Sequence, residues 1–288
     1  MDCGIFDNLF LVRDLLELGL RDGLSFTLLS LDQEKVFNRV DHGYLLSTLW
    51  AFGFGPRFVG FLRVLYTSAE CLVKLNWTLT EPVSFGRGER QGCSLSGQLY
   101  ALAIELFLCL LRRRLTGLVL WQPELRQPEL QLVLSAYADD VLLMVQDLGD
   151  LARVEACQAI YSAASSTQVN WVKSSGLAVG DWQQASSLPP ALQTIRWSAG
   201  SLLYLGVYLS ATHPSPPENW ENLEGGVIEQ LRKWTGLLRC LSLRGRALVL
   251  NQLVLSTLWY RLNTLALAPG FLTNLRTSIL GFFWSGMH

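Results

Sequence analysis

Three aspartates are the residues of this chain whose type and placement best suit metal chemistry. Asp139 and Asp140 are adjacent between two apolar segments, and Asp32 ends a third apolar segment, residues 25–31. Adjacent carboxylates in apolar surroundings oppose each other's ionisation, and a divalent cation would relieve that repulsion. Mg²⁺ prefers a few carboxylates together with phosphate oxygens and water. The three residues therefore suit a site for two Mg²⁺ ions, with Mn²⁺ as an alternative, that would activate a hydroxyl and stabilise a leaving pyrophosphate.

Each part of this pattern also has a purely structural interpretation. A pair of aspartates in a hairpin turn is common, because Asp suits turn conformations. An aspartate after a strand is no more specific when it stands alone. The combination of Asp32 with the pair Asp139 and Asp140 is what favours a metal site.

The apolar pattern predicts the elements that position these carboxylates. Residues 25–31 are short, apolar and rich in strand-forming types, which predicts a buried strand that ends at Asp32. Residues 132–137 and 141–146 predict two strands of a tight hairpin, with Asp139 and Asp140 at its turn. A glycine-rich turn over residues 86–97 precedes a long helix over residues 98–114.

The remaining segments predict a mixed α+β fold. We expect a helix over 42–52 with Asp41 as its N-cap, and a helix from 151 capped by Asp150. A near tandem repeat of QPEL over 122–131 indicates a loop insertion. The other expected elements are helices over 5–20, 57–68, 221–239, 243–262 and 270–284, a hairpin from 71–76 and 83–85, and a strand within 203–209.

Composition narrows the class of protein. Half of the 288 residues are apolar and 16% are charged, against about 25% in an average soluble chain. This excludes a disordered chain. The longest apolar stretch, 99–111, is interrupted by Glu105 and is too short to span a membrane. The N-terminus lacks the features of a signal peptide. None of the six cysteines forms a Cys-x-x-Cys pair, which disfavours a zinc knuckle. We expect a reducing, intracellular compartment.

The net charge of −1 conceals an uneven distribution. Residues from Gly226 onward carry seven basic side chains and one acidic side chain, a net charge of +6, so the earlier part carries −7. An acidic N-terminal part followed by a basic, helical C-terminal part is the distribution expected of a metal site joined to a surface that binds a polyanion.

Five ordered segments resemble the palm motifs of reverse transcriptases from non-LTR (LINE-type) retrotransposons. They read LSLDQEKVFNRVDH, GRGERQGCSLSGQLYALAIE, SAYADDVLLMV, VNWVKSSGL and YLGVYLS. The resemblance extends over residues 5–285. It implies a right-hand polymerase palm with partial fingers and a helical thumb. Residues 1–212 would form the fingers remnant and palm, 213–220 a linker, and 221–288 the thumb-like region.

The resemblance implies a role for each matching residue. Asp32, Asp139 and Asp140 would be the catalytic metal ligands. The nucleotide contacts would be Phe37 as a steric gate, Gln91, Gly92 and Lys173. The contacts to an RNA template and DNA primer would be Tyr204, Leu205, Gly206, Arg232, Lys233, Arg244 and Arg246. Core packing for Phe37, and solvation for Lys173 and for each thumb cation, remain open alternatives.

The chain also departs from the family's pattern at Val36, Asn38 and Ser94. The earlier fingers segment and the endonuclease are expected to be missing, as in an element-derived fragment with exposed apolar patches where the fingers would pack. Two hypotheses follow: an RNA-directed DNA polymerase core that uses dNTPs, or an inactive remnant that at most binds nucleic acid or protein. An unrelated α/β hydrolase or receiver-like site is disfavoured by the ordered motifs. The resemblance implies a nuclear or cytoplasmic protein, neither secreted nor membrane-bound, and leaves the oligomeric state open.

Overall fold

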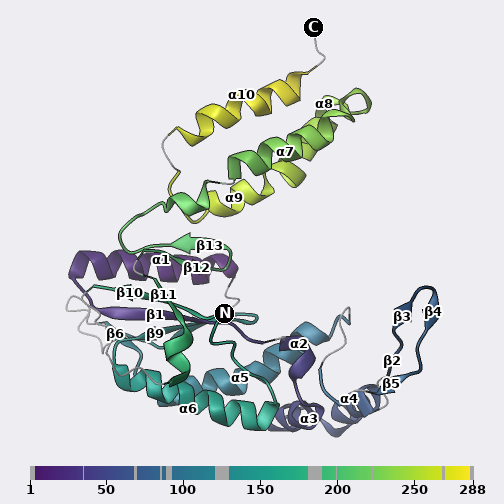
Figure 1. Ribbon diagram of the computed structural model, residues 1–288, viewed down its shortest axis with the longest axis vertical. Coiled ribbons are helices and arrows are strands. Elements are labelled where there is room, and N and C mark those ends of the chain that lie inside the picture. Colours follow the sequence, from purple (N-terminus) through teal and green to yellow (C-terminus); the bar gives the residue numbers. More distant parts are fainter. Residues whose placement is uncertain are drawn as a thin grey trace. The chain divides into compact units, whose positions relative to one another are not determined.

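The computed structural model divides into two compact units (Figure 1). Residues 25–197 form one unit, here called the inner unit, and residues 1–24 with 198–288 form the other, here called the terminal unit. The structure describes residues 4–34, 36–67, 70–84, 86–88, 93–120, 130–180, 190–198, 200–221, 223–267 and 270–285. The mixed α+β class expected from the sequence is confirmed.

A five-stranded sheet organises the inner unit. Its order is β11–β10–β1–β9–β8, so that β1 lies at the centre and pairs antiparallel with both β9 and β10. The strands are β1 (Phe26–Leu31), β8 (Leu134–Tyr137), β9 (Asp140–Val145), β10 (Ser175–Val179) and β11 (Arg196–Ser198). Five of the six residues of β1 are buried, and buried Thr27 donates its hydroxyl hydrogen to the carbonyl oxygen of Leu177 at 2.9 Å. The central strand is therefore buried, and the hydroxyl of its one buried threonine has a hydrogen-bond partner.

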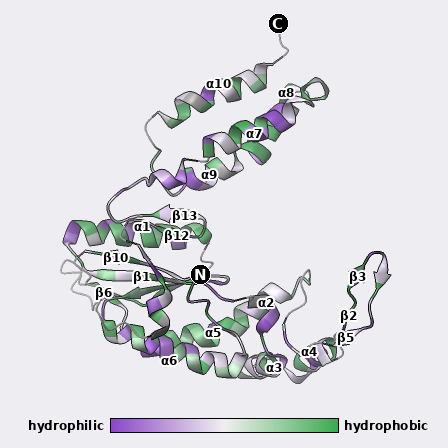
Figure 2. Cartoon of the chain, in the orientation of Figure 1, coloured by the Kyte–Doolittle hydropathy of each residue, from purple (hydrophilic) through white to green (hydrophobic). Residues whose placement is uncertain are grey.

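Two long helices, α5 (Ser96–Arg114) and α6 (Leu148–Ser165), lie on one side of this sheet (Figure 1). The rings of Phe107 and Tyr161 stack between them with centroids 4.6 Å apart. The middle of α5 is hydrophobic (Figure 2), and its buried residues join the same core as the side chains of β1 and β9. The shorter helices are α2 (Val36–Arg39), α3 (His42–Ala51) and α4 (Pro56–Thr67).

The start of α6 corrects one expectation. The helix begins at Leu148 with Asp147 as its N-cap, so the prediction that Asp150 caps a helix from residue 151 was wrong. Asp150 is fully buried and accepts hydrogen bonds from the backbone N–H groups of Thr116 (3.0 Å) and Gly117 (2.8 Å), and it pairs with Arg153. Its role is to hold the chain that follows α5.

Two small hairpins and a 3₁₀ turn lie beside the main sheet and helices in the described part of the inner unit. The expected hairpin after α4 is present as β2 (Glu70–Cys71) with β5 (Val83–Ser84) and β3 (Lys74–Leu75) with β4 (Thr78–Leu79). A further pair is β6 (Leu118–Leu120) with β7 (Leu130–Leu132), and most of the QPEL repeat between them lies outside the described residues. A 3₁₀ turn, η1 (Pro190–Thr194), precedes β11.

The terminal unit combines one N-terminal helix with a hairpin and a set of C-terminal helices. Helix α1 (Ile5–Asp22) ends at Gly23, whose φ of 65° makes the left-handed C-cap. The expected strand within 203–209 is divided into β12 (Leu202–Tyr204) and β13 (Val207–Leu209), because Leu205 and Gly206 turn the chain with φ of 48° and 76°. The remaining elements are η2 (Pro217–Asn219), α7 (Leu223–Thr235), η3 (Leu238–Cys240), α8 (Leu243–Val249), the π-helical turn η4 (Leu250–Val254), α9 (Ser256–Leu262) and α10 (Phe271–Trp284).

The two units are divided at different residues from the predicted domains, so the functional division into palm, linker and thumb stays a prediction. Exposed apolar side chains are present: Leu11 and Leu20 on α1, and a larger group on the hairpin over residues 70–84. Within the described residues, no helix has both the length and the apolar character needed to cross a membrane.

Candidate active site

The three predicted carboxylates lie at one end of the inner sheet. The ladder between β1 and β9 ends at the pair Leu31 and Val141, so Asp32, the next residue, comes opposite Asp140. The hairpin between β8 and β9 closes at the pair Tyr137 and Asp140, which leaves Ala138 and Asp139 as its two-residue turn. All three aspartates are exposed. The structure therefore brings together residues that are far apart in the sequence.

The turn that carries Asp139 has a constrained backbone. Ala138 adopts a φ of 54°, a left-handed conformation that is uncommon for residues other than glycine. Tight two-residue hairpins favour such positive values, because their twist then matches that of the strands. The strands β8 and β9 thus hold the two neighbouring aspartates in a fixed turn.

The surroundings of Asp140 disfavour the ionised form of its carboxyl group. Loss of solvent raises the pKa of Asp140 above its ordinary value, and the charges of Asp139 and Asp32 raise the same pKa further. Asp140 and the two carboxylates whose charges act on it fit a divalent cation in charge and in ligand type. Among the described residues, however, no three His, Cys, Asp or Glu side chains are gathered closely enough to hold an ion as they stand. A bound ion would have to draw the carboxylates of Asp32, Asp139 and Asp140 together.

The segment that contains Lys173 anchors Asp32. The carbonyl oxygen of Asp32 accepts a hydrogen bond from the backbone N–H of Asn170 at 2.7 Å, and the N–H of Asp32 bonds to the hydroxyl of Ser174 at 3.1 Å. The turn over residues 171–173 loops out between these two contacts, and Lys173 is exposed in it. The backbone of Asp32 is thereby tied on both sides of the turn that carries Lys173.

The glycine-rich segment starts next to the Asp32 motif. The N–H of Gly88 donates to the carbonyl oxygen of Val40 at 2.8 Å, and a ring nitrogen of His42 lies 2.8 Å from the carbonyl oxygen of Gly88. Gly88 has a φ of 85°, and a Cβ there would lie 2.9 Å from the Cα of Asn38, so glycine is required. These hydrogen bonds fasten the glycine-rich segment to the chain between α2 and the start of α3.

The predicted nucleotide contacts are only partly described. Phe37 belongs to α2, which directly follows the Asp32 segment, but its side chain lies outside the described part of the structure, as do Gln91 and Gly92. Asn38 is exposed on α2, and Ser94 is exposed in the turn that precedes α5.

The predicted primer-contacting hairpin belongs to the terminal unit. Tyr204 is buried in β12, and Leu205 and Gly206 form the turn. The hydroxyl of Tyr260 on α9 donates a 2.6 Å hydrogen bond to the carbonyl oxygen of Leu205. The turn is therefore fixed to the helices of the same unit, in a different compact unit from the aspartates.

The four predicted thumb cations differ in their surroundings. Arg232 and Arg244 are exposed, and the ammonium of Lys233 pairs with the Glu229 carboxylate at 2.9 Å on the surface. Arg246 is buried, and its guanidinium donates to three carbonyl oxygens: those of Phe283 (2.9 Å), Ser285 (2.7 Å) and Leu238 (3.2 Å). This network binds the end of α10 to α8, and no local sequence signal at Arg246 indicated it.

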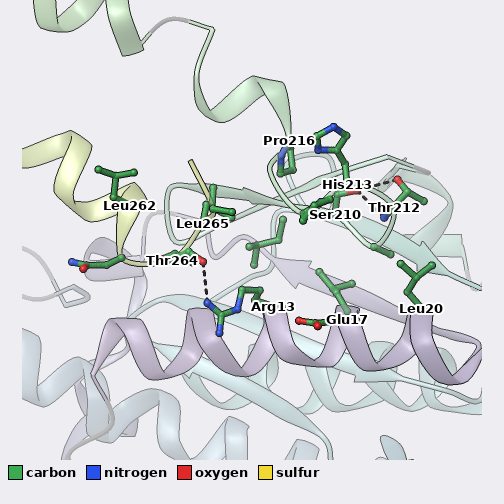
Figure 3. A pocket seen from close by; sticks show the side chains of 16 residues that line it. Arg13, Glu17, Leu20, Ser210, Thr212, His213, Pro216, Leu262, Thr264 and Leu265 are labelled. Carbon is green, nitrogen blue, oxygen red and sulfur yellow. Dashed lines mark hydrogen bonds between the residues drawn. The ribbon is translucent and has the colours of Figure 1, made fainter. Parts of the chain in front are cut away.

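A pocket of about 550 Å³ lies within the terminal unit, against α1 (Figure 3). Arg13 and Glu17 of α1 lie on one side, and the guanidinium of Arg13 donates to the carbonyl oxygen of Thr264 at 3.1 Å. Its other walls come from residues 209–216 and 262–266. None of the predicted site residues lines this pocket.

Comparisons with known proteins agree with the motifs. A family model described as reverse transcriptase (RNA-dependent DNA polymerase) matches residues 7–209. The uncharacterised 149 kDa protein of transposon TX1 from Xenopus laevis is 56% identical over 284 residues, which is 99% of this chain and 21% of that protein. The Pol polyprotein of the type-1 retrotransposable element R2 from Popillia japonica is 24% identical over 141 residues, 49% of this chain and 22% of that protein. The chain thus spans about a fifth of these relatives.

The fold also has a counterpart among solved structures. Telomerase from Candida tropicalis, solved with a fragment of telomeric RNA, aligns over 94% of this chain and 41% of that chain with a TM-score of 0.50. The sequences are 12% identical, so this likeness concerns the fold alone.

Proposed function

Since this chain belongs to the reverse transcriptase family, we propose that it is the RNA-directed DNA polymerase core of a LINE-type retroelement. It would transfer deoxynucleotides onto the 3′-hydroxyl of a primer, copying an RNA template. The observation that carries the proposal is the meeting of Asp32 with Asp139 and Asp140 at one end of the inner sheet. The similarity to the transposon TX1 and R2 proteins supports the assignment to a non-LTR element.

The reaction requires positive charge at the end of the sheet where the aspartates lie. Divalent ions, two Mg²⁺ or alternatively Mn²⁺, would supply the positive charge that activates the primer hydroxyl and neutralises the leaving pyrophosphate. Asp32, Asp139 and Asp140 would hold them. The raised pKa of Asp140 supports this role: desolvation is its largest cause, and the charges of Asp139 and Asp32 add repulsion that a cation would relieve.

The residues around the aspartates would bind the incoming nucleotide. We assign Lys173 to the triphosphate, because its turn is bonded to the backbone of Asp32. Its ammonium would offset charge or donate a proton to pyrophosphate. Phe37 would exclude a ribose 2′-hydroxyl, and Gln91 and Gly92 would contact the nucleotide.

The terminal unit would hold the primer and template. Tyr204, Leu205 and Gly206 would contact the primer, and Arg232, Lys233 and Arg244 would contact the phosphates of an RNA–DNA hybrid. Lys233 would first have to leave Glu229, which is a small cost for an exposed pair. We leave Arg246 out of this set, because its guanidinium is buried and bonded to carbonyl oxygens. Residues 1–212 would then be the fingers remnant and palm, 213–220 the linker and 221–288 the thumb. The chain would act where template RNA is present, in the nucleus or the cytoplasm.

Primer extension tests the proposal. The chain is incubated with an RNA template, a labelled DNA primer, dNTPs and Mg²⁺ or Mn²⁺, beside the variant Asp139→Ala. Incorporation by the unchanged chain, and its loss in the variant, is the expected result. Phe37→Val in the same assay should increase incorporation of ribonucleotides relative to deoxynucleotides.

A second candidate is a catalytically inactive remnant that binds nucleic acid or protein. One observation favours it: within the described residues, the aspartates are not gathered closely enough to hold an ion as they stand. Binding of an RNA–DNA duplex without any incorporation above the Asp139→Ala control would select this candidate.

A further inference from the structure

A β-hairpin over residues 70–84, here called the β-arm, extends from the end of α4 (Figure 1). It is built from the ladders β2–β5 and β3–β4, and none of its 15 residues is buried. A two-stranded hairpin without further packing is marginally stable in water. The β-arm also exposes several large apolar side chains: Leu72, Val73, Leu75, Trp77, Leu79 and Val83. A segment of this kind gains stability from a binding partner.

The tip of the β-arm presents one aromatic ring. Asn76 and Trp77 form the turn with φ of 45° and 70°, and Trp77 is 90% exposed. The ammonium of Lys74 lies 4.4 Å from the centroid of the Trp77 ring. This cation–π contact orients the indole and leaves most of its surface open to another flat group.

The charge near the tip favours an anionic partner. Lys74 is the one charged residue among residues 71–80, and the acids Glu70 and Glu81 stand at the base of the β-arm. An exposed aromatic ring beside a cation is the combination with which proteins bind single-stranded nucleic acid, by stacking on a base and by contact with a phosphate. A duplex hides the faces of its bases, so unpaired nucleotides suit this surface better.

We propose that the β-arm is a second nucleic-acid contact, at which an unpaired base of the template RNA stacks on Trp77 and Lys74 contacts the adjoining phosphate. The proposal rests on the proposed function, in which the chain copies RNA. It adds a binding site that is separate from the aspartates, and it assigns a partner to the exposed apolar tip.

The test measures RNA binding without catalysis. Fluorescence anisotropy of a short, unstructured, labelled RNA is titrated with the full chain in the absence of dNTPs and divalent ions. Trp77→Ala should weaken binding about tenfold, as expected for the loss of one stacked base, and Trp77→Phe should recover most of it. Lys74→Ala should lower the slope of log affinity against log salt by about one.

Leu75→Ala is the matched control. Leu75 is exposed in the same strand, but adjacent strand residues point to opposite faces, so its side chain lies on the face away from Lys74. Its RNA affinity should equal that of the unchanged chain. Circular dichroism of each variant checks the fold, which a substitution at a fully exposed tip should leave intact.

Two results would overturn the inference. One is RNA affinity unchanged by Trp77→Ala. The other is a loss of RNA affinity in Leu75→Ala equal to that in Trp77→Ala, accompanied by a loss of self-association in sedimentation, which would assign the β-arm to contact between copies of the chain. Primer extension is scored separately with Asp139→Asn, which should leave RNA affinity unchanged. Failure of the polymerase proposal is thereby distinguished from failure of this one.

Discussion

Asp140 lies opposite Asp32 where strand β9 begins and strand β1 ends, because the last pair of their ladder joins Val141 to Leu31. The turn residue Asp139 brings a third carboxylate to the same end of the sheet. Desolvation, then the charge of Asp139, then that of Asp32 raise the pKa of Asp140.

Replacing Asp140 by Asn should stabilise the fold at neutral pH in the absence of divalent ions. Its pKa in the folded chain is raised above the ordinary value of 3.8, so the folded state binds the proton more tightly than the unfolded state does. The stability that this proton contributes is present below pH 3.8 and is lost as the pH rises through the raised pKa. At pH 7 we expect a gain of a few tenths of a kcal/mol, since solvent screens an exposed carboxylate.

Urea unfolding at pH 7 and at pH 3.5 measures this gain. The gain should shrink at the lower pH. Asp22→Asn is the control, because the hydrogen bond from Arg21 lowers the pKa of Asp22 and its removal should give no gain. Equal stability of Asp140→Asn and the unchanged chain at pH 7 would contradict the raised pKa of Asp140, and with it the desolvation and repulsion assigned to this carboxylate.

Mg²⁺ should raise the melting temperature of the chain through the aspartates. An ion present at ten times its dissociation constant stabilises the folded state by about 1.4 kcal/mol, or about 3 °C for a chain of this size. Differential scanning fluorimetry with and without EDTA measures the shift. Asp32→Asn and Asp139→Asn should each reduce this shift. If both variants showed the same shift as the unchanged chain, the ion would bind elsewhere.

Asp150→Ala should destabilise the inner unit without a direct effect on chemistry. The substitution leaves the buried N–H groups of Thr116 and Gly117 without their acceptor, at a cost of about 2–4 kcal/mol. Asp147→Ala, which removes the exposed N-cap of α6, should cost about 1 kcal/mol. Denaturant unfolding of both variants checks the order, and a larger loss in Asp147→Ala would reverse the two roles.

Lys173→Ala should lower the rate of nucleotide incorporation and leave template affinity intact. A positioned acid contributes at least about 100-fold to rate. Single-nucleotide incorporation under saturating dNTP measures the rate, and anisotropy measures the affinity. Lys173→Arg should recover binding of the dNTP but not the full rate, because arginine keeps the charge without donating its proton. An unchanged rate in Lys173→Ala would leave Lys173 as a solvated surface residue.

Elements specified by local patterns were predictable from the sequence. The hairpin that carries Asp139 and Asp140 follows from two apolar strands around a turn, and the N-cap at Asp41 is confirmed by its acceptance of a hydrogen bond from the N–H of Tyr44 at 2.9 Å. Strand β10 was missed, because its residues Ser175–Val179 include Gly and Ala, and its place is set by pairing with β1.

Roles that depend on distant contacts could not be inferred locally. From the local sequence, Arg246 resembles an exposed cation on a surface helix. Its guanidinium is instead bonded to carbonyl oxygens at the end of α10, almost forty residues later in the chain. Asp150 was confused with Asp147, because both precede the helical pattern and both suit an N-cap. Only the tertiary contact with Thr116 and Gly117 separates them.

The most direct test of the central claim is single-nucleotide incorporation on an RNA template, with the unchanged chain beside Asp139→Asn and Asp22→Asn. Asp22 is an exposed aspartate outside the site, at the end of α1, and therefore controls for the loss of one carboxylate. We predict Mg²⁺- or Mn²⁺-dependent incorporation by the unchanged chain and by Asp22→Asn, and background incorporation by Asp139→Asn. No incorporation by the unchanged chain above the level of Asp139→Asn would contradict the assignment of Asp32, Asp139 and Asp140 as a working polymerase site.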